Sequence, residues 1–310
     1  NPSIKFADTP AGQAVMASDD PVFLWRSVRI AAGKAPTDNW YPNVNQGSVG
    51  WCVGAATKHA MDTLTAIQIV QNGHLAEWKP SSGEAVYGGS RVQIGNTRSG
   101  EGSLGRWAKD WLLQYGSISM EQHGSHDLRQ VSIQRAAQWG RTGVPSDLIP
   151  IAKQSPIRSA AMVTSFAELD RAIRQGYPCN VCSNQGFRFP RDSNGFASAS
   201  GEWMHSMAIL GVRGAPRRGA FILNSWGDTA HSGPVWPPDA PVAGFWADAD
   251  VVDRMLKQRD SFVYSDAVGF PVRNLDWFVK NEHPSQPKPS KERSYAAVRP
   301  NQNPNSQTNR

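Results

Sequence analysis

The first half of the chain carries apolar residues at helical spacing. The clearest segment runs from Cys52 to Gln71 and is followed by Asn72 and Gly73, residues that commonly end helices. The same spacing recurs in shorter segments that end at glycine or in polar sequence. The pattern predicts helices over 52–71, 82–88, 104–115, 128–140 and 166–175.

After Tyr177 the pattern changes to short apolar runs separated by turn residues, which is typical of strands. A further strand is predicted at 21–29, and residues 1–20, which are small and polar, are predicted to form an extended arm. A mostly helical first half and a mostly β second half are compatible with the α+β class. The predicted strands of the second half are 179–183, 205–212, 220–224, 244–246 and 263–270.

Composition divides the chain into three parts. Residues 1–20 form the arm, 21–279 form one large folded domain, and 280–310 form a basic, low-complexity tail rich in Pro, Asn, Gln and Ser. Such a tail lacks the apolar residues needed to fold alone, so a protein partner is expected wherever it is ordered. The tail carries most of the net charge of +6, and the nearly balanced remainder gives little support for nucleic-acid binding.

The chain of 310 residues is long enough to bury a sizeable core, and 39% of its residues are hydrophobic. No apolar run reaches the ~18 residues of a membrane span, so no membrane span is expected. No signal peptide is visible, and the localisation is left open. Cys179 and Cys182 have C-x-x-C spacing, but on one strand they would point to opposite faces, which disfavours a disulfide or a shared metal.

The segment from Gln46 to Cys52 has the composition of a nucleophile turn. Cys52 would begin the long predicted helix, where the helix dipole favours a thiolate. Gln46 lies six residues earlier, across a glycine-bearing turn. Its side-chain amide, together with the backbone N–H of Cys52, would donate hydrogen bonds to an oxyanion.

The second half supplies matching groups. His205 lies at the start of a predicted buried strand, and Asn224 ends the next strand in the segment Asn224-Ser225-Trp226-Gly227. An imidazole beside a cysteine can act as base and then as acid, and an amide oxygen can orient that imidazole. His231 is the fallback base, whereas His59 would lie about 10 Å from Cys52 along one helix, too far for a hydrogen bond.

Gln46, Cys52, His205 and Asn224 match, in chain order, the four active-site positions of the papain-like cysteine peptidases, which this chain resembles. The resemblance implies a two-lobe fold, with a helical lobe over about 46–150 and an antiparallel β lobe over about 151–279 plus 21–45. It implies hydrolysis of peptide bonds in a protein or peptide substrate, without metal or organic cofactor. It also implies substrate contacts by Gly102, Ser103, Gly50, Trp51 and Trp226.

The chain departs from the family pattern at three places. Val53 follows the cysteine where the family usually has tryptophan, and Met204 precedes the histidine where Asp or Asn is common. The family's second Trp-Gly pair is replaced by residues 228–234. These departures leave the four chemical groups intact but change the surroundings of the site.

Two other functions remain open from the sequence. The first is a papain-like structural or interaction module without activity, which the unusual insert after Gly227 and the tail favour. The second is an acyl transferase that uses the same three groups. The segment from Gly100 to Gly105 matches G-x-G-x-x-G, but no clear strand precedes it, so nucleotide binding is not expected.

Overall fold

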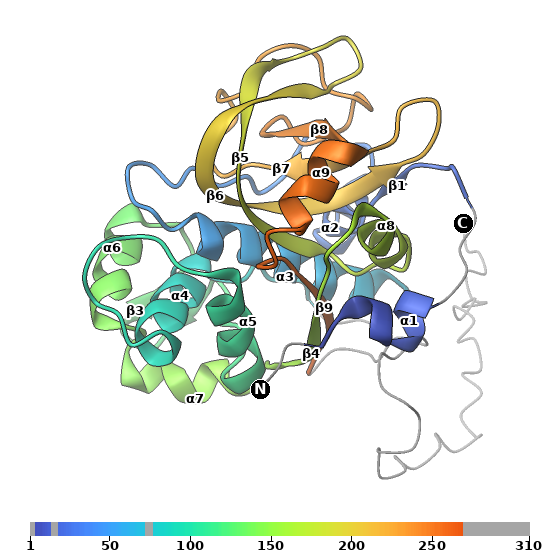
Figure 1. Cartoon of the computed structure of the whole chain (residues 1–310). Coiled ribbons are helices and arrows are strands. Elements are labelled where there is room, and N and C mark those ends of the chain that lie inside the picture. The colour runs from blue at the N-terminus through green and yellow to red at the C-terminus, as the bar shows by residue number, and fades with distance from the viewer. Residues whose placement is uncertain (1–3, 14–17, 72–76, 269–310) are drawn as a thin grey trace, which may run out of the picture. The chain divides into compact units, whose positions relative to one another are not determined.

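The computed structural model describes residues 4–13, 18–71 and 77–268. The predicted tail at 280–310, the end of the last predicted strand and the predicted helix stop at Asn72 and Gly73 lie outside the described residues. Figure 1 shows helices α4, α5, α6 and α7 gathered on one side, strands β5 to β8 on the other, and α3 between them.

The helices on this side follow one another closely along the chain. After α3 comes α4, which leads directly into a π-helical turn, η2. A small hairpin of β2 and β3 separates α5 from α6. The bounds are α3 Cys52–Gln71, α4 Gly83–Gly88, η2 Gly89–Ile94, α5 Gly105–Gln114, β2 Gln122–His123, β3 His126–Asp127, α6 Ile133–Thr142, the 3-10 turn η3 Ser146–Leu148 and α7 Ile149–Ala152.

The β side is an antiparallel sheet with strand order β4-β9-β5-β6-β7-β8, and β1 pairs with β6. β5 and β6 form a long hairpin, far longer than the sequence pattern predicts, and α8 and α9 lie beside the sheet. The bounds are β1 Val22–Phe23, β4 Ile157–Met162, α8 Phe166–Arg174, β5 Cys179–Arg191, β6 Ala197–Arg213, β7 Gly219–Leu223, β8 Gly244–Asp248, α9 Ala249–Leu256 and β9 Phe262–Ala267.

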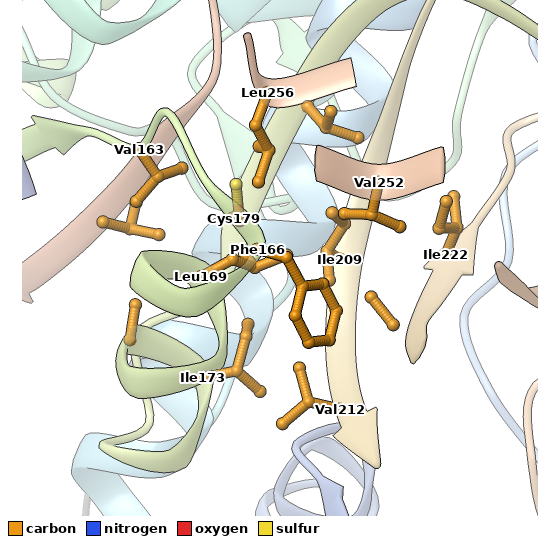
Figure 2. Packing of buried hydrophobic residues seen from close by; sticks show 14 of the residues in the cluster. Val163, Phe166, Leu169, Ile173, Cys179, Ile209, Val212, Ile222, Val252 and Leu256 are labelled. Atoms are coloured by element: carbon orange, nitrogen blue, oxygen red, sulfur yellow. The ribbon is translucent and has the colours of Figure 1, made fainter. Parts of the chain in front are cut away.

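Both faces of the central strands are covered, which explains the unbroken apolar run in β6. Ile209 and Val212 lie in a cluster with Phe166 and Leu169 of α8 and Val252 of α9 (Figure 2). The alternate residues, Ala208 and Leu210, belong to a second cluster with side chains of α2 (Trp25–Ala31) and α3. The sheet is therefore held between two helical layers.

Helix α3 is buried from Cys52 to Ile69, which its small and apolar residues permit. Its contact with α4 depends on Gly54, where a Cβ would lie 2.4 Å from the carbonyl oxygen of Gly83. Thr57 accepts a hydrogen bond from Asn180 of β5 at 2.5 Å. The helix that begins at Cys52 is thus fixed against both the helices and the sheet.

Several predicted elements differ from the structure. The strand predicted at 21–29 is β1 for two residues only and then helix α2, because Arg29 is buried and donates to Trp40 and Asp239. The predicted arm begins with two short helical turns, η1 Phe6–Asp8 and α1 Pro10–Gln13, and Phe6 is buried in the core. Strand β4 and helix α9 were not predicted, and the helix predicted at 128–140 begins later, at Ile133.

The predicted α+β class is confirmed, with helices and an antiparallel sheet in one fold. Within the described ranges, none of the helices combines the length and apolar character needed to cross a bilayer.

A buried ion pair in α3 gives a test of this packing. Lys58 Nζ lies 2.5 Å from Asp62 Oδ2, and Asp62 Oδ1 also accepts from the backbone N–H of Ser81 at 2.6 Å. We expect Lys58→Met to lower the free energy of unfolding by about 3–5 kcal/mol, because an unpaired carboxylate stays buried. Lys58→Met with Asp62→Asn removes that charge and keeps an acceptor for Ser81, so it should lose less. Equal losses in chemical denaturation would contradict this account.

Candidate active site

The turn before α3 is held by one hydrogen bond to the β side and by another within the turn itself. The backbone N–H of Gln46 donates to the carbonyl of Ser225 at 2.8 Å, which ties the turn to the β side. The Trp51 indole donates to the carbonyl of Gln46 at 3.0 Å. Trp51 is fully buried beside Val44, so the structure places it in the core and not on a substrate-binding surface as the resemblance implied. This turn sets Cys52 as the first residue of α3.

The register between β6 and β7 brings the second half of the site together. Ala208 pairs with Leu223, and the same antiparallel register, continued three residues, places His205 opposite Trp226. The two rings stack, with centroids 4.6 Å apart and planes at 28°. Trp226 therefore covers one face of the imidazole.

His205 and Asn224 form a directed hydrogen bond. His205 Nε2 lies 2.8 Å from Asn224 Oδ1, and the same oxygen accepts from the backbone N–H of Ser225 at 2.7 Å. An amide oxygen can only accept, so His205 carries its proton on Nε2 and leaves a lone pair on Nδ1. Asn224 is fully buried, and this bond is shielded from water.

Cys52 and His205 line the same cavity, which has a volume of about 550 Å³. The same cavity is lined by Val53, the second residue of α3, and by Ser206, which follows His205 on β6. Strand β6 and the N-terminus of α3 thus form adjoining parts of one cavity wall. The structure brings the predicted nucleophile and base to one cavity.

Burial governs the protonation of both groups. It raises the pKa of the Cys52 thiol, and the backbone donors of Ser206, Val53 and Cys52 partly oppose the shift. Burial also lowers the pKa of His205 to about 4, against the opposing hydrogen bond to Asn224. Both shifts favour a neutral thiol and a neutral imidazole, whereas the helix dipole alone would favour a thiolate.

Gln46 is placed beside the site with one donor hydrogen still available. Its Nε2 donates to the carbonyl of Val49 at 3.0 Å, and its Oε1 accepts from the Ser225 hydroxyl at 2.7 Å. An amide nitrogen has two hydrogens, and Val49 accepts one of them. The hydroxyl of Ser225 therefore fixes which end of the amide presents N–H, a role that the sequence analysis missed.

The loop before α5 forms another wall of the cavity, and it includes Gly102 and Ser103. Buried Arg91 holds this loop by donating to the carbonyls of Ser99 and Gly100, each at 2.9 Å, and to the carbonyl of Gly102. Arg91 also donates to the distant carbonyl of Gly140 at 2.8 Å, and the sequence analysis did not single it out.

Gly50 lies next to this loop and contacts it through the backbone. Its N–H donates to Glu101 Oε2 at 2.7 Å. Gly50, Trp226 and Gln46 border the site but are not among the residues that line the cavity.

The two cysteines of the C-x-x-C sequence do point to opposite faces of β5. Cys179 lies in the core under α8 and α9, whereas Cys182 lines the cavity that contains Cys52. Both are free thiols, and burial raises the pKa of each. The sequence analysis did not predict a second cysteine in the cavity, although the alternation of side chains along a strand places Cys182 on the face opposite Cys179.

Comparison with known proteins gives a likeness of structure without a likeness of sequence. No model of a known protein family matches the chain, and no curated protein matches it. Among solved structures, xylellain, a cysteine protease from Xylella fastidiosa, is 17% identical, with a TM-score of 0.55 over 87% of this chain and 92% of that chain.

Two further solved structures are similar. Digestive procathepsin L 3 of the Tenebrio molitor larval midgut is 13% identical, with a TM-score of 0.51 over 83% of this chain and 72% of that chain. The ragweed pollen allergen Amb a 11, a cysteine protease in its proform, is 14% identical, with a TM-score of 0.52 over 85% and 70%. The chain therefore has the fold of the papain-like cysteine proteases.

The lowered pKa of His205 makes a prediction for stability. In the unfolded chain a histidine titrates near 6.5, so the unfolded state takes up a proton that the folded state refuses until about pH 4. The free energy of unfolding should therefore fall as the pH falls through this range. One histidine contributes at most about 1.4 kcal/mol per pH unit. His205→Gln should reduce this slope in denaturant titrations, and an unchanged slope would contradict the assignment.

Proposed function

We propose that the chain is a cysteine peptidase that hydrolyses peptide bonds through Cys52, His205 and Asn224. The observation that carries the proposal is the 2.8 Å hydrogen bond from His205 to Asn224, made by a ring that lines one cavity with Cys52. The helix N-terminus at Cys52 and the fold shared with cysteine proteases support it.

In the proposed first step, Cys52 Sγ attacks the carbonyl carbon of the substrate. The thiol proton passes to His205 Nδ1, which holds the free lone pair because Nε2 is protonated toward Asn224. The carbonyl oxygen becomes an oxyanion. The backbone N–H of Cys52 and the remaining Nε2 hydrogen of Gln46 donate to it.

The intermediate then collapses, and the carbon–nitrogen bond breaks. His205 returns its proton to the leaving amine, and a thioester between Cys52 and the acyl part of the substrate remains. Water attacks this thioester, His205 accepts the water proton, and the carboxylic acid and the free thiol are released. Trp226 keeps water from the His205–Asn224 hydrogen bond throughout.

The substrate would lie along the cavity wall formed by residues 99–103. Arg91 fixes this loop through carbonyl groups, so the loop presents a rigid edge to an extended peptide. Gly102 has a positive φ of 83°, and open space surrounds the position of a Cβ there. Gly102 and Ser103 are the residues we assign to substrate contact.

The nucleophile is tested by covalent labelling. A peptidyl vinyl sulfone should add to Cys52 in the wild-type protein, and peptide mapping by mass spectrometry should locate the adduct. Cys52→Ala should abolish labelling and peptide hydrolysis. Cys182→Ser is the matched control, because it removes the other thiol of the cavity and should leave labelling in place. Labelling that persists in Cys52→Ala would refute the assignment.

The oxyanion donor is tested by kinetics. Gln46→Ala should lower kcat about 10²- to 10³-fold with little change in KM, because its N–H acts only when charge develops. Ser225→Ala removes the hydroxyl that orients Gln46 but keeps the donor, so its loss should be smaller. Equal kcat values for Gln46→Ala and wild type would rule out this role for Gln46.

A further inference from the structure

A second buried histidine lies on the far side of Asn224 from His205. His231 belongs to the segment after Gly227 that departs from the family pattern, and it is 4% exposed. Its Nε2 lies 3.1 Å from Asn224 Nδ2, and its Nδ1 lies 3.2 Å from the carbonyl oxygen of Phe189. Both ring nitrogens therefore have defined partners.

These partners determine which nitrogen of His231 carries the proton and which end of the Asn224 amide faces each neighbour. The Phe189 carbonyl can only accept, so His231 carries its proton on Nδ1 and presents an unprotonated Nε2 to Asn224. Asn224 Nδ2 donates to that nitrogen. Asn224 Oδ1 is left to accept from His205 Nε2 and from Ser225 N.

The two ends of an amide have nearly the same shape, so hydrogen bonds must choose between them. If the Asn224 amide were reversed, its NH₂ group would face the N–H of Ser225 and the protonated Nε2 of His205. Its oxygen would face the lone pair of His231. All three contacts would then be unfavourable, and the contact with His205 could be relieved only by moving the His205 proton to Nδ1.

We propose that His231 is a positioning residue that holds the Asn224 amide in one orientation and thereby keeps the proton of His205 on Nε2. This inference rests on the proposed function, in which His205 Nδ1 accepts the proton of Cys52. His231 touches neither the substrate nor the sulfur, and it acts only through Asn224.

The surroundings of His231 hold the ring in place. Arg191 donates to the carbonyls of His231 at 3.2 Å and of Gly233 at 2.8 Å, which fixes the backbone of the segment. Phe245 packs on the ring with centroids 4.7 Å apart, and the ring of Phe189 lies 5.8 Å away.

The protonation state of His231 matches this role. Burial lowers its pKa to about 4, and the nearby charge of Arg191 on β5 and the His205 ring on β6 act in the same direction. The Phe189 carbonyl opposes the shift. The ring is therefore neutral at pH 7 and keeps Nε2 free to accept. Below about pH 4, a protonated Nε2 would face the Asn224 NH₂ group.

The most direct test is the tautomer of each histidine in the wild-type full-length protein. NMR of the protein labelled with ring-¹⁵N histidine should show Nδ1–H for His231 and Nε2–H for His205 at pH 7. This measurement needs no substrate and no variant. A proton on Nε2 of His231 would overturn the proposal even if the protein hydrolyses peptides. The expected tautomers with no peptidase activity would instead remove the proposed function alone.

Two variants of His231 distinguish a positioning role from a role in packing alone. His231→Leu removes the acceptor and should lower kcat about 10- to 100-fold at nearly constant KM, because the Asn224 NH₂ group is left unpaired. The same variant should show a mixture of His205 tautomers. His231→Gln keeps an acceptor on a side chain of similar reach and should recover most of the lost kcat.

A double-mutant cycle gives the control. In the Asn224→Ala background there is no amide to orient, so adding His231→Leu should change kcat by less than about 3-fold. A purely structural role would give the same penalty in both backgrounds. Equal penalties, or an unchanged His205 tautomer in His231→Leu, would overturn the proposal.

Discussion

The hydrogen bond between His205 and Asn224 is the interaction on which the site depends. It has a direction, because the amide oxygen only accepts, and this direction decides which nitrogen of His205 is free to act as a base. The bond is possible because β6 and β7 are adjacent and antiparallel, and their register carries His205 past the end of β7 to the Asn224–Trp226 segment. The orientation of the His205 ring, and with it the chemistry proposed for Cys52, thus depends on the pairing of β6 with β7.

The position of Cys52 depends on a different constraint, the burial of α3 between the helices and the sheet. From Cys52 to Ile69 this helix has no exposed side, and two of its charged residues, Lys58 and Asp62, pair with each other in the interior. The Gln46 turn is joined to Ser225 through both backbone and side chain. The two halves of the site are therefore connected at the turn as well as at the cavity.

Much of this could be predicted from the sequence. The buried helix was predicted to begin at Cys52, as it does, because its apolar spacing is continuous from there; its predicted end at Asn72 and Gly73 lies outside the described residues. The region of α2 was predicted as a strand from its aromatic and β-branched residues. The helix there is fixed by long-range bonds of Arg29 to Asp239, which no local window contains. Strand β4, rich in alanine, becomes a strand by pairing with β9.

The candidate site shows the same difference between residues marked by a local sequence pattern and residues that depend on long-range contacts. Cys52, His205, Asn224 and Gln46 could be found because each lies in a short recognisable segment. Ser225 and Arg191 act through partners that only the fold brings near, and His231 was considered only as a substitute base. Trp51 looked like a cleft residue from its position beside Cys52, but the turn directs its ring into the core.

The central claim is that the sulfur of Cys52 and the Nδ1 atom of His205 act on one substrate carbonyl. A crystal structure of the protein with a covalently bound peptidyl inhibitor tests it most directly. The account predicts a thioether at Cys52 Sγ, His205 Nδ1 turned toward that sulfur, and Nε2 still bonded to Asn224. A ring turned away from the sulfur, or an inhibitor attached to another residue, would contradict it.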